Sequence, residues 1–245
     1  MRKLTISVLS ILLASVSVVA YPRFVNSNET INSTNTRSAK AIFEAAYRNR
    51  YTWNQNFPGY TAKVLANYGG KEERGVITVY PNLEVEVKGI GDLEIAKMVE
   101  DQILMEIIHR RNIPFEQLHG QSTFKIQKEN FGTTEIEKIG DDSSLYKVKD
   151  RTIIQVNRPM GEEMAVTVDT LETTATPEGY LSSEYLATFY NPKTNEVVEK
   201  ERTIDRHQKV GDYYLLSFRE VYQNEASPKS DNPDIAVRYE NLSLL

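Results

Sequence analysis

The spacing of apolar residues constrains this fold most, because it changes at Tyr60 from the period of a helix to that of a strand. Just after this point Ala62, Val64 and Ala66 alternate with polar neighbours, the pattern of a sheet with one buried face. Further strands are predicted over residues 75–80, 83–87, 123–128, 134–139, 145–148, 152–156, 164–171, 181–190, 196–205 and 213–222. Consecutive strands in such number favour an antiparallel sheet that curls to limit its edges.

Two stretches have helical spacing. The first begins at Ser38, a suitable N-cap residue, and runs to about Tyr51. The second runs from about Leu93 to His109, has one broad apolar side and ends before Pro114, with only strands expected afterwards. We therefore predict an α+β fold: a strongly curved antiparallel sheet of about eight to eleven strands, forming an open half-barrel with two helices on its concave side.

The first twenty residues have the layout of a secretory signal peptide. A basic Met1-Arg2-Lys3 head precedes an apolar run that ends in small residues at Ala20. The run is short for a membrane span, although retention as an anchor is the alternative. Export to a periplasm, a thylakoid lumen or the medium is expected. We predict a linker rich in Asn, Ser and Thr over residues 21–38, one globular domain over 39–223 and a loose tail over 224–245.

Composition excludes several classes of function. The chain has no Cys, so disulfides, an N-terminal acyl anchor and a thiol nucleophile are all ruled out. Its net charge is -5 and it has no basic run, which argues against a nucleic-acid partner. It has neither a phosphate-binding loop nor a G-x-S-x-G elbow. No cofactor is expected, and no transmembrane span is expected once the signal segment is cleaved.

Polar candidates for chemistry are few. His109 and His119 lie ten residues apart, near Glu106 and Glu116, but a zinc site wants three or four ligands at tighter spacing, so no metal site is predicted. His119 with a nearby carboxylate remains a weak catalytic candidate for a hydrolase or isomerase. The acidic residues between 162 and 184 are interpreted as the wet face of the sheet rather than as a glycosidase pair.

Aromatic residues are the main remaining signal, with fourteen Tyr, eight Phe and one Trp. Such side chains line apolar ligand cavities, but they also form ordinary cores. The leading hypothesis is a non-catalytic binding protein for an apolar small molecule such as a lipid or pigment. The alternatives are the His119 enzyme and an assembly or scaffolding factor for an unknown protein partner. The residues expected to line the ligand are Phe43, Tyr47, Trp53, Phe57, Met98 and Ile103.

Three segments together carry a family resemblance. They are residues 45–53 with Phe57-Pro58-Gly59-Tyr60, then His119-Gly120 before Thr123-Phe124, and then residues 164–171 with 177–181. The chain thereby resembles an uncharacterised family of unknown function found mainly in cyanobacteria and other photosynthetic lineages, over about residues 39–222. This resemblance implies a shared fold and carries no activity. Members of that family often lack a signal peptide, so the exported form here is a departure.

A second likeness concerns architecture alone. A first helix, long strands, a helical insertion and a late strand beginning at Lys209 are similar to the periplasmic lipoprotein-carrier superfamily. That resemblance implies an open, half-closed barrel over an apolar cavity that holds acyl chains.

Overall fold

The computed structural model describes residues 38–140, 143–223 and 232–245, so the predicted signal peptide and nearly all of the predicted linker lie outside it. The described residues form three helices and twelve strands. The helices are α1 (Ala39–Arg48), α2 (Leu93–Arg110) and α3 (Phe115–His119). The strands are β1 (Tyr60–Tyr68), β2 (Lys71–Val79), β3 (Val85–Lys88), β4 (Thr123–Asn130), β5 (Thr133–Ile139), β6 (Ser144–Lys149), β7 (Thr152–Pro159), β8 (Ala165–Thr176), β9 (Gly179–Tyr190), β10 (Val197–Val210), β11 (Tyr213–Gln223) and β12 (Ile235–Leu244).

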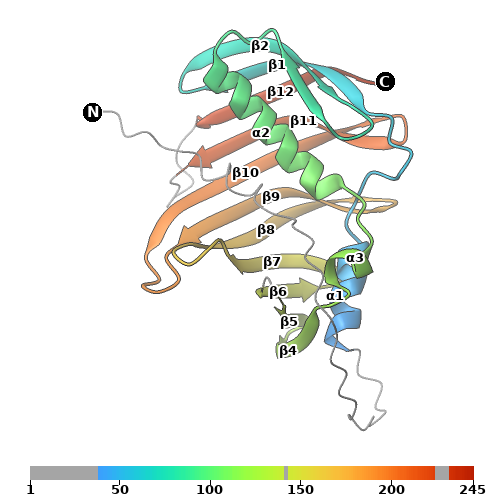
Figure 1. Ribbon diagram of the computed structural model, residues 1–245, viewed down its shortest axis with the longest axis vertical. Coiled ribbons are helices and arrows are strands. Elements are labelled where there is room, and N and C mark those ends of the chain that lie inside the picture. The colour runs from blue at the N-terminus through green and yellow to red at the C-terminus, as the bar shows by residue number, and fades with distance from the viewer. Residues whose placement is uncertain (1–37, 141–142, 224–231) are drawn as a thin grey trace. The chain divides into compact units, whose positions relative to one another are not determined.

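All twelve strands belong to one sheet, in which neighbouring strands are antiparallel (Figure 1). Their order is β3-β2-β1-β12-β11-β10-β9-β8-β7-β6-β5-β4. Strands β3 and β4 are the two edges, so the sheet is unclosed. This confirms the antiparallel α+β class. The expected eight to eleven strands and two helices are too few, because a strand and a short helix went unrecognised.

The unrecognised strand is β12, which lies between β1 and β11 and joins the first strands of the chain to the last ones. Val64 lies opposite Tyr239, and Val221 opposite Ile235. The expectation of a loose tail is therefore wrong for Ile235–Leu244. The side chains of Ile235, Val237 and Tyr239 alternate into the core, but a polar stretch with two prolines before them obscured this pattern in the sequence.

The helices begin where the sequence supplies caps. The Ser38 hydroxyl accepts a hydrogen bond from the Ala41 amide at 3.2 Å, and the Asp92 carboxylate caps α2 by accepting from Glu94 and Ile95. Helix α3 starts directly after Pro114 and ends at His119. The expectation that only strands follow Pro114 is therefore wrong, because proline precedes a helix as readily as it ends one.

Both long helices pack on one face of the sheet, at separate places. In what we call the α2 cluster, Ile95, Val99 and Ile103 pack against β1, β2, β11 and β12. In the α1 cluster, Phe43 and Tyr47 pack with α3 and against β5 and β6. No helix among the described residues is long and apolar enough to cross a membrane.

Candidate functional site

The six residues expected to line a ligand separate into the two clusters. Phe43 and Tyr47 belong to the α1 cluster, whereas Trp53, Phe57, Met98 and Ile103 belong to the α2 cluster. None is more than 9 % exposed. The Trp53 ring stacks on Phe57 with centroids 4.1 Å apart, and its indole N–H donates to the Tyr214 carbonyl at 3.2 Å. The structure therefore does not bring the six together, and their role toward a ligand remains a prediction.

His119 ends α3 inside a group of aromatic rings. Its imidazole lies against the rings of Phe43, Tyr47, Phe115 and Phe124, with centroids 5.1–6.4 Å apart. Burial, assisted by the charges of Lys138 and Arg50, lowers the pKa of His119 to about 4. Its Nδ1 is buried without a hydrogen-bond partner, and no carboxylate pairs with it in the described part of the chain. This is a neutral packing residue, and the geometry gives the hydrolase hypothesis no support.

A buried charged network joins α2 to the sheet. The Arg219 guanidinium on β11 donates to both carboxylate oxygens of Asp205 on β10, at 2.7 and 2.6 Å. It also donates to the backbone carbonyl of Gln102 on α2 at 2.9 Å. Arg219 is 1 % exposed. An ion pair this deep must be fully hydrogen-bonded to offset its lost hydration, and these three bonds meet that need.

Glu106 is the acidic centre on the helix side of this network. Its Oε1 lies 2.7 Å from Arg110 Nε and 3.1 Å from His207 Nε2, and its Oε2 lies 3.7 Å from Arg219 Nη2. Burial acts to raise the pKa of Glu106, but Arg110, His207 and Arg219 outweigh it and hold that pKa well below its usual range. Glu106 is therefore a carboxylate anion that keeps α2 on the sheet.

Between the two clusters lies a part of the same face that neither cluster includes. Directly opposed residues of antiparallel strands point to the same side. The helix-bearing face therefore continues through one row of paired positions: Glu201, Ala187, Val168, Val156, Tyr146 and Ile136. We call Val156, Val168, Tyr185 and Ala187 the interhelical strip. Its members belong to neither cluster, and all but Ala187 are only half-buried.

One end of the interhelical strip carries two buried carboxyl groups, Glu201 and Glu199, on β10. Glu201 is 4 % exposed. Burial, with the neighbouring Glu199, raises its pKa to about 7. Burial also raises the pKa of Glu199, whose Oε1 has no hydrogen-bond partner among the described residues. Groups whose pKa lies near neutrality gather at functional sites more often than elsewhere.

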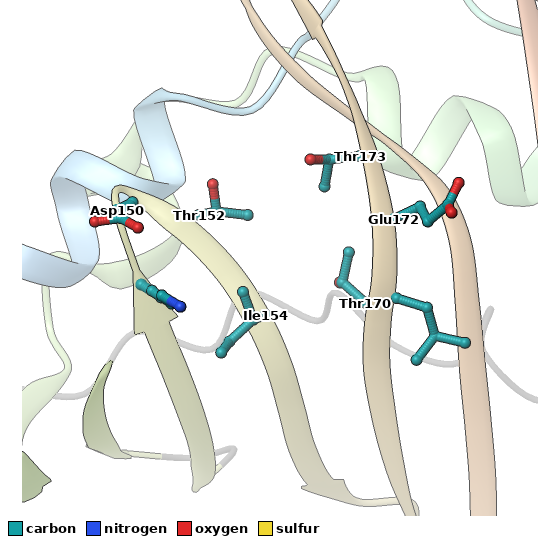
Figure 2. A pocket seen from close by; sticks show the side chains of 8 residues that line it. Asp150, Thr152, Ile154, Thr170, Glu172 and Thr173 are labelled. Atoms are coloured by element: carbon teal, nitrogen blue, oxygen red, sulfur yellow. The ribbon is translucent and has the colours of Figure 1, made fainter. Parts of the chain in front are cut away.

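At the other side of the strip the sheet opens. Strands β7 and β8 are paired only as far as Gln155 and Asp169, and beyond this point they separate. A hollow of about 210 Å³ lies between them. Figure 2 shows Thr152, Ile154, Thr170 and Thr173 around this gap. Thr170 lies opposite Tyr185 of the interhelical strip. The residues that line the hollow are largely polar. The hollow is therefore better suited to be the entrance of a binding site than the apolar surface that holds the ligand.

Sequence reasoning missed most of these polar residues. Gln102, Glu106 and Arg110 lie four residues apart on α2, a spacing that places them on one helix face and could have revealed a polar stripe within an apolar helix. Glu199, Glu201 and Asp205 gave no such signal, because they alternate with other charged residues. Within the described ranges, no group of three or more His, Asp or Glu side chains could hold a metal ion.

Comparison with known proteins gives one strong match and weak structural likenesses. No curated protein matches the chain. A solved DUF1329 family protein from Desulfovibrio piger is similar at 10 % identity and a TM-score of 0.27, over 85 % of this chain and 94 % of that one. MucB is similar at 9 % identity and a TM-score of 0.24, over 82 % of this chain and 92 % of that one. Likenesses this weak carry no argument about function.

The strong match is to a family model. The model described as "Protein of unknown function (DUF3386)" matches residues 34–245, which include every described strand and helix. This confirms the expected membership of an uncharacterised family, while the association with cyanobacteria remains a prediction. The chain belongs to the DUF3386 family of proteins of unknown function.

Proposed function

We propose that this is an exported, non-catalytic binding or carrier protein for an apolar small molecule such as a lipid or pigment. The observation that carries the proposal is the interhelical strip. Val156, Val168 and Tyr185 are only half-buried on the face where both helices pack. Half-buried apolar side chains of this kind offer a ligand an apolar surface, and a packed cluster borders that surface on each side.

The energetics require no catalytic group. Transferring an alkyl chain from water to such a surface contributes about 0.8 kcal/mol per buried CH₂. In this proposal the sheet curves around the ligand as an open half-barrel, with α1 and α2 flanking it. The six predicted wall residues then lie in the clusters on either side of the strip, and they touch a ligand only where the clusters repack around it. Export follows from the predicted signal peptide.

Two substitutions on opposite faces of the sheet test this proposal. Val168 lies in the interhelical strip, whereas Leu186 lies opposite Asp169 on the other face and is also half-buried. The apolar dye N-phenyl-1-naphthylamine is titrated into the wild type, Val168→Gln and Leu186→Gln, with circular dichroism to check folding. We expect the dye to bind the wild type and Leu186→Gln alike and Val168→Gln several-fold more weakly. Equal binding by all three, or no binding, would contradict the proposal.

A further inference from the structure

The interhelical strip changes from apolar to acidic at a single strand boundary. Val156, Val168 and Ala187 are apolar, and the next position of the row, on β10, is Glu201. Glu199 lies two residues before Glu201 on the same strand, so its side chain is on the same face. Glu199 lies opposite Phe189 on β9, which in turn lies opposite Val166 on β8. Both rows thus place a buried carboxyl group at the end of an apolar surface.

In the described part of the chain, no basic side chain forms an ion pair with either of these two carboxyl groups. The charge of Arg219 acts to lower the pKa of Glu201 but does not outweigh burial, and the Glu199 Oε1 atom is buried without a hydrogen-bond partner among the described residues. The Arg219 guanidinium on this face is bound instead to Asp205 and Gln102. Lys200 and Arg202 alternate with the two glutamates on β10 and point to the opposite face.

The same face offers one more cation in the row of Glu199, but it is distant. Arg158 lies opposite Val166, three strands away from β10. Three strand spacings amount to about 14 Å, too far for an ion pair. Ionisation of either carboxyl group therefore leaves a buried negative charge without a counter-ion among the described residues, which is unfavourable until something supplies one.

We infer that the ligand is an amphiphile whose apolar part lies on the interhelical strip and whose polar end is a protonated amine bound by Glu201 and Glu199. This inference rests on the proposed function. An ammonium group donates up to three hydrogen bonds and neutralises the buried charge. An anionic head group would be repelled, and a neutral one would not compensate the charge of either carboxylate on ionisation.

Ligands that differ only in the head group test the inference. Decylamine, decanol and sodium decanoate, each below its micellar concentration, are used to displace N-phenyl-1-naphthylamine from the wild-type protein. The same titrations are made with Glu201→Gln and Glu199→Gln. Glu220→Gln is the matched control, because Glu220 is a half-buried glutamate on the other face of the neighbouring strand β11.

We expect decylamine to bind the wild type about tenfold more tightly than decanol, with decanoate weakest, because measured couplings of close charge pairs in an interface reach that factor. Glu201→Gln should lose this preference and Glu199→Gln should reduce it, while binding of all three ligands by Glu220→Gln should match that of the wild type. If the three ligands bind alike, the head-group inference is overturned while the proposed binding function stands. If none of the ligands and no dye binds, both fail.

Discussion

Arg219 on β11 and Asp205 on β10 form a bidentate ion pair beneath α2, with donor–acceptor distances of 2.7 and 2.6 Å. The two residues lie directly opposite each other in the strand register. The same guanidinium reaches the Gln102 carbonyl, so one side chain connects two strands and the long helix. Because helix and sheet are joined by charge as well as by apolar contacts, the position of α2 depends on this pair.

Removing one partner of the pair should be strongly destabilising. Arg219→Leu leaves the Asp205 carboxylate buried and uncompensated, which should lower the free energy of unfolding by about 3–5 kcal/mol. Urea denaturation measures the change. Arg238→Leu is the control, because Arg238 is exposed on the other face, and it should cost less than about 1 kcal/mol. A loss for Arg219→Leu no larger than that of the control would show that the pair does not hold α2.

Two buried tyrosines separate the effect of a satisfied hydroxyl from that of an unsatisfied one. Both are 2 % exposed, but the Tyr239 hydroxyl has no hydrogen-bond partner among the described residues, while the Tyr51 hydroxyl accepts from the Tyr214 amide at 2.8 Å. Tyr51→Phe should cost about 1 kcal/mol of unfolding free energy, whereas Tyr239→Phe should be neutral or stabilising. Denaturation of the two variants side by side checks this. Equal losses would mean that the Tyr239 hydroxyl has a partner in solution.

The sheet was predictable from the sequence because most of its strands show the alternation expected of one buried face. Strand β1 illustrates this, since Ala62, Val64 and Ala66 all point into the core. The chain failed to reveal β12 because its alternation follows a polar stretch in which two prolines favour a loop. Short α3 was hidden for a different reason, since five residues are too few to show a helical period.

The candidate site was less predictable because its strand inverts the usual pattern. On β10 the buried positions are Glu199, Glu201, Thr203 and Asp205, while Ile204 lies on the other face. Alternation alone would place the carboxylates in water. Only the register shows that Asp205 lies opposite a cation, Arg219, whereas Glu201 lies opposite an apolar residue, Ala187. Such pairings join residues far apart in sequence.

The buried carboxyl of Glu201 should make stability depend on pH. Its pKa rises from 4.5 to about 7 on folding, so the folded state holds the proton more tightly than the unfolded chain. Its contribution is fully present below pH 4.5 and is lost as the pH rises through 7, by about 3 kcal/mol in total. Relative to the wild type, Glu201→Gln should therefore gain about that much unfolding free energy between pH 4.5 and pH 8.

Urea denaturation of both proteins at several pH values measures this gain. Glu220→Gln serves as the control and should follow the wild type throughout, because its carboxyl lies on the other face of the sheet. Parallel stability profiles for the wild type and Glu201→Gln would show that Glu201 ionises in the folded protein as it does in the unfolded chain.

His119 should contribute to packing rather than to catalysis. Its ring contacts four aromatic side chains in the α1 cluster. His119→Ala should therefore lower the unfolding free energy by about 2–3 kcal/mol, through loss of buried contacts and the cavity left behind. His119→Leu should recover much of that loss in the same denaturation experiment. Unchanged stability in His119→Ala would favour the catalytic alternative instead.

The most direct test of a bound apolar molecule is the mass of the protein as its own host makes it. Native mass spectrometry of the purified wild type, before and after extraction with organic solvent, should show a discrete extra mass that the solvent removes. Val168→Gln from the same host should carry less of it, because the change places an amide in the interhelical strip. A bare polypeptide mass before extraction would contradict the carrier account.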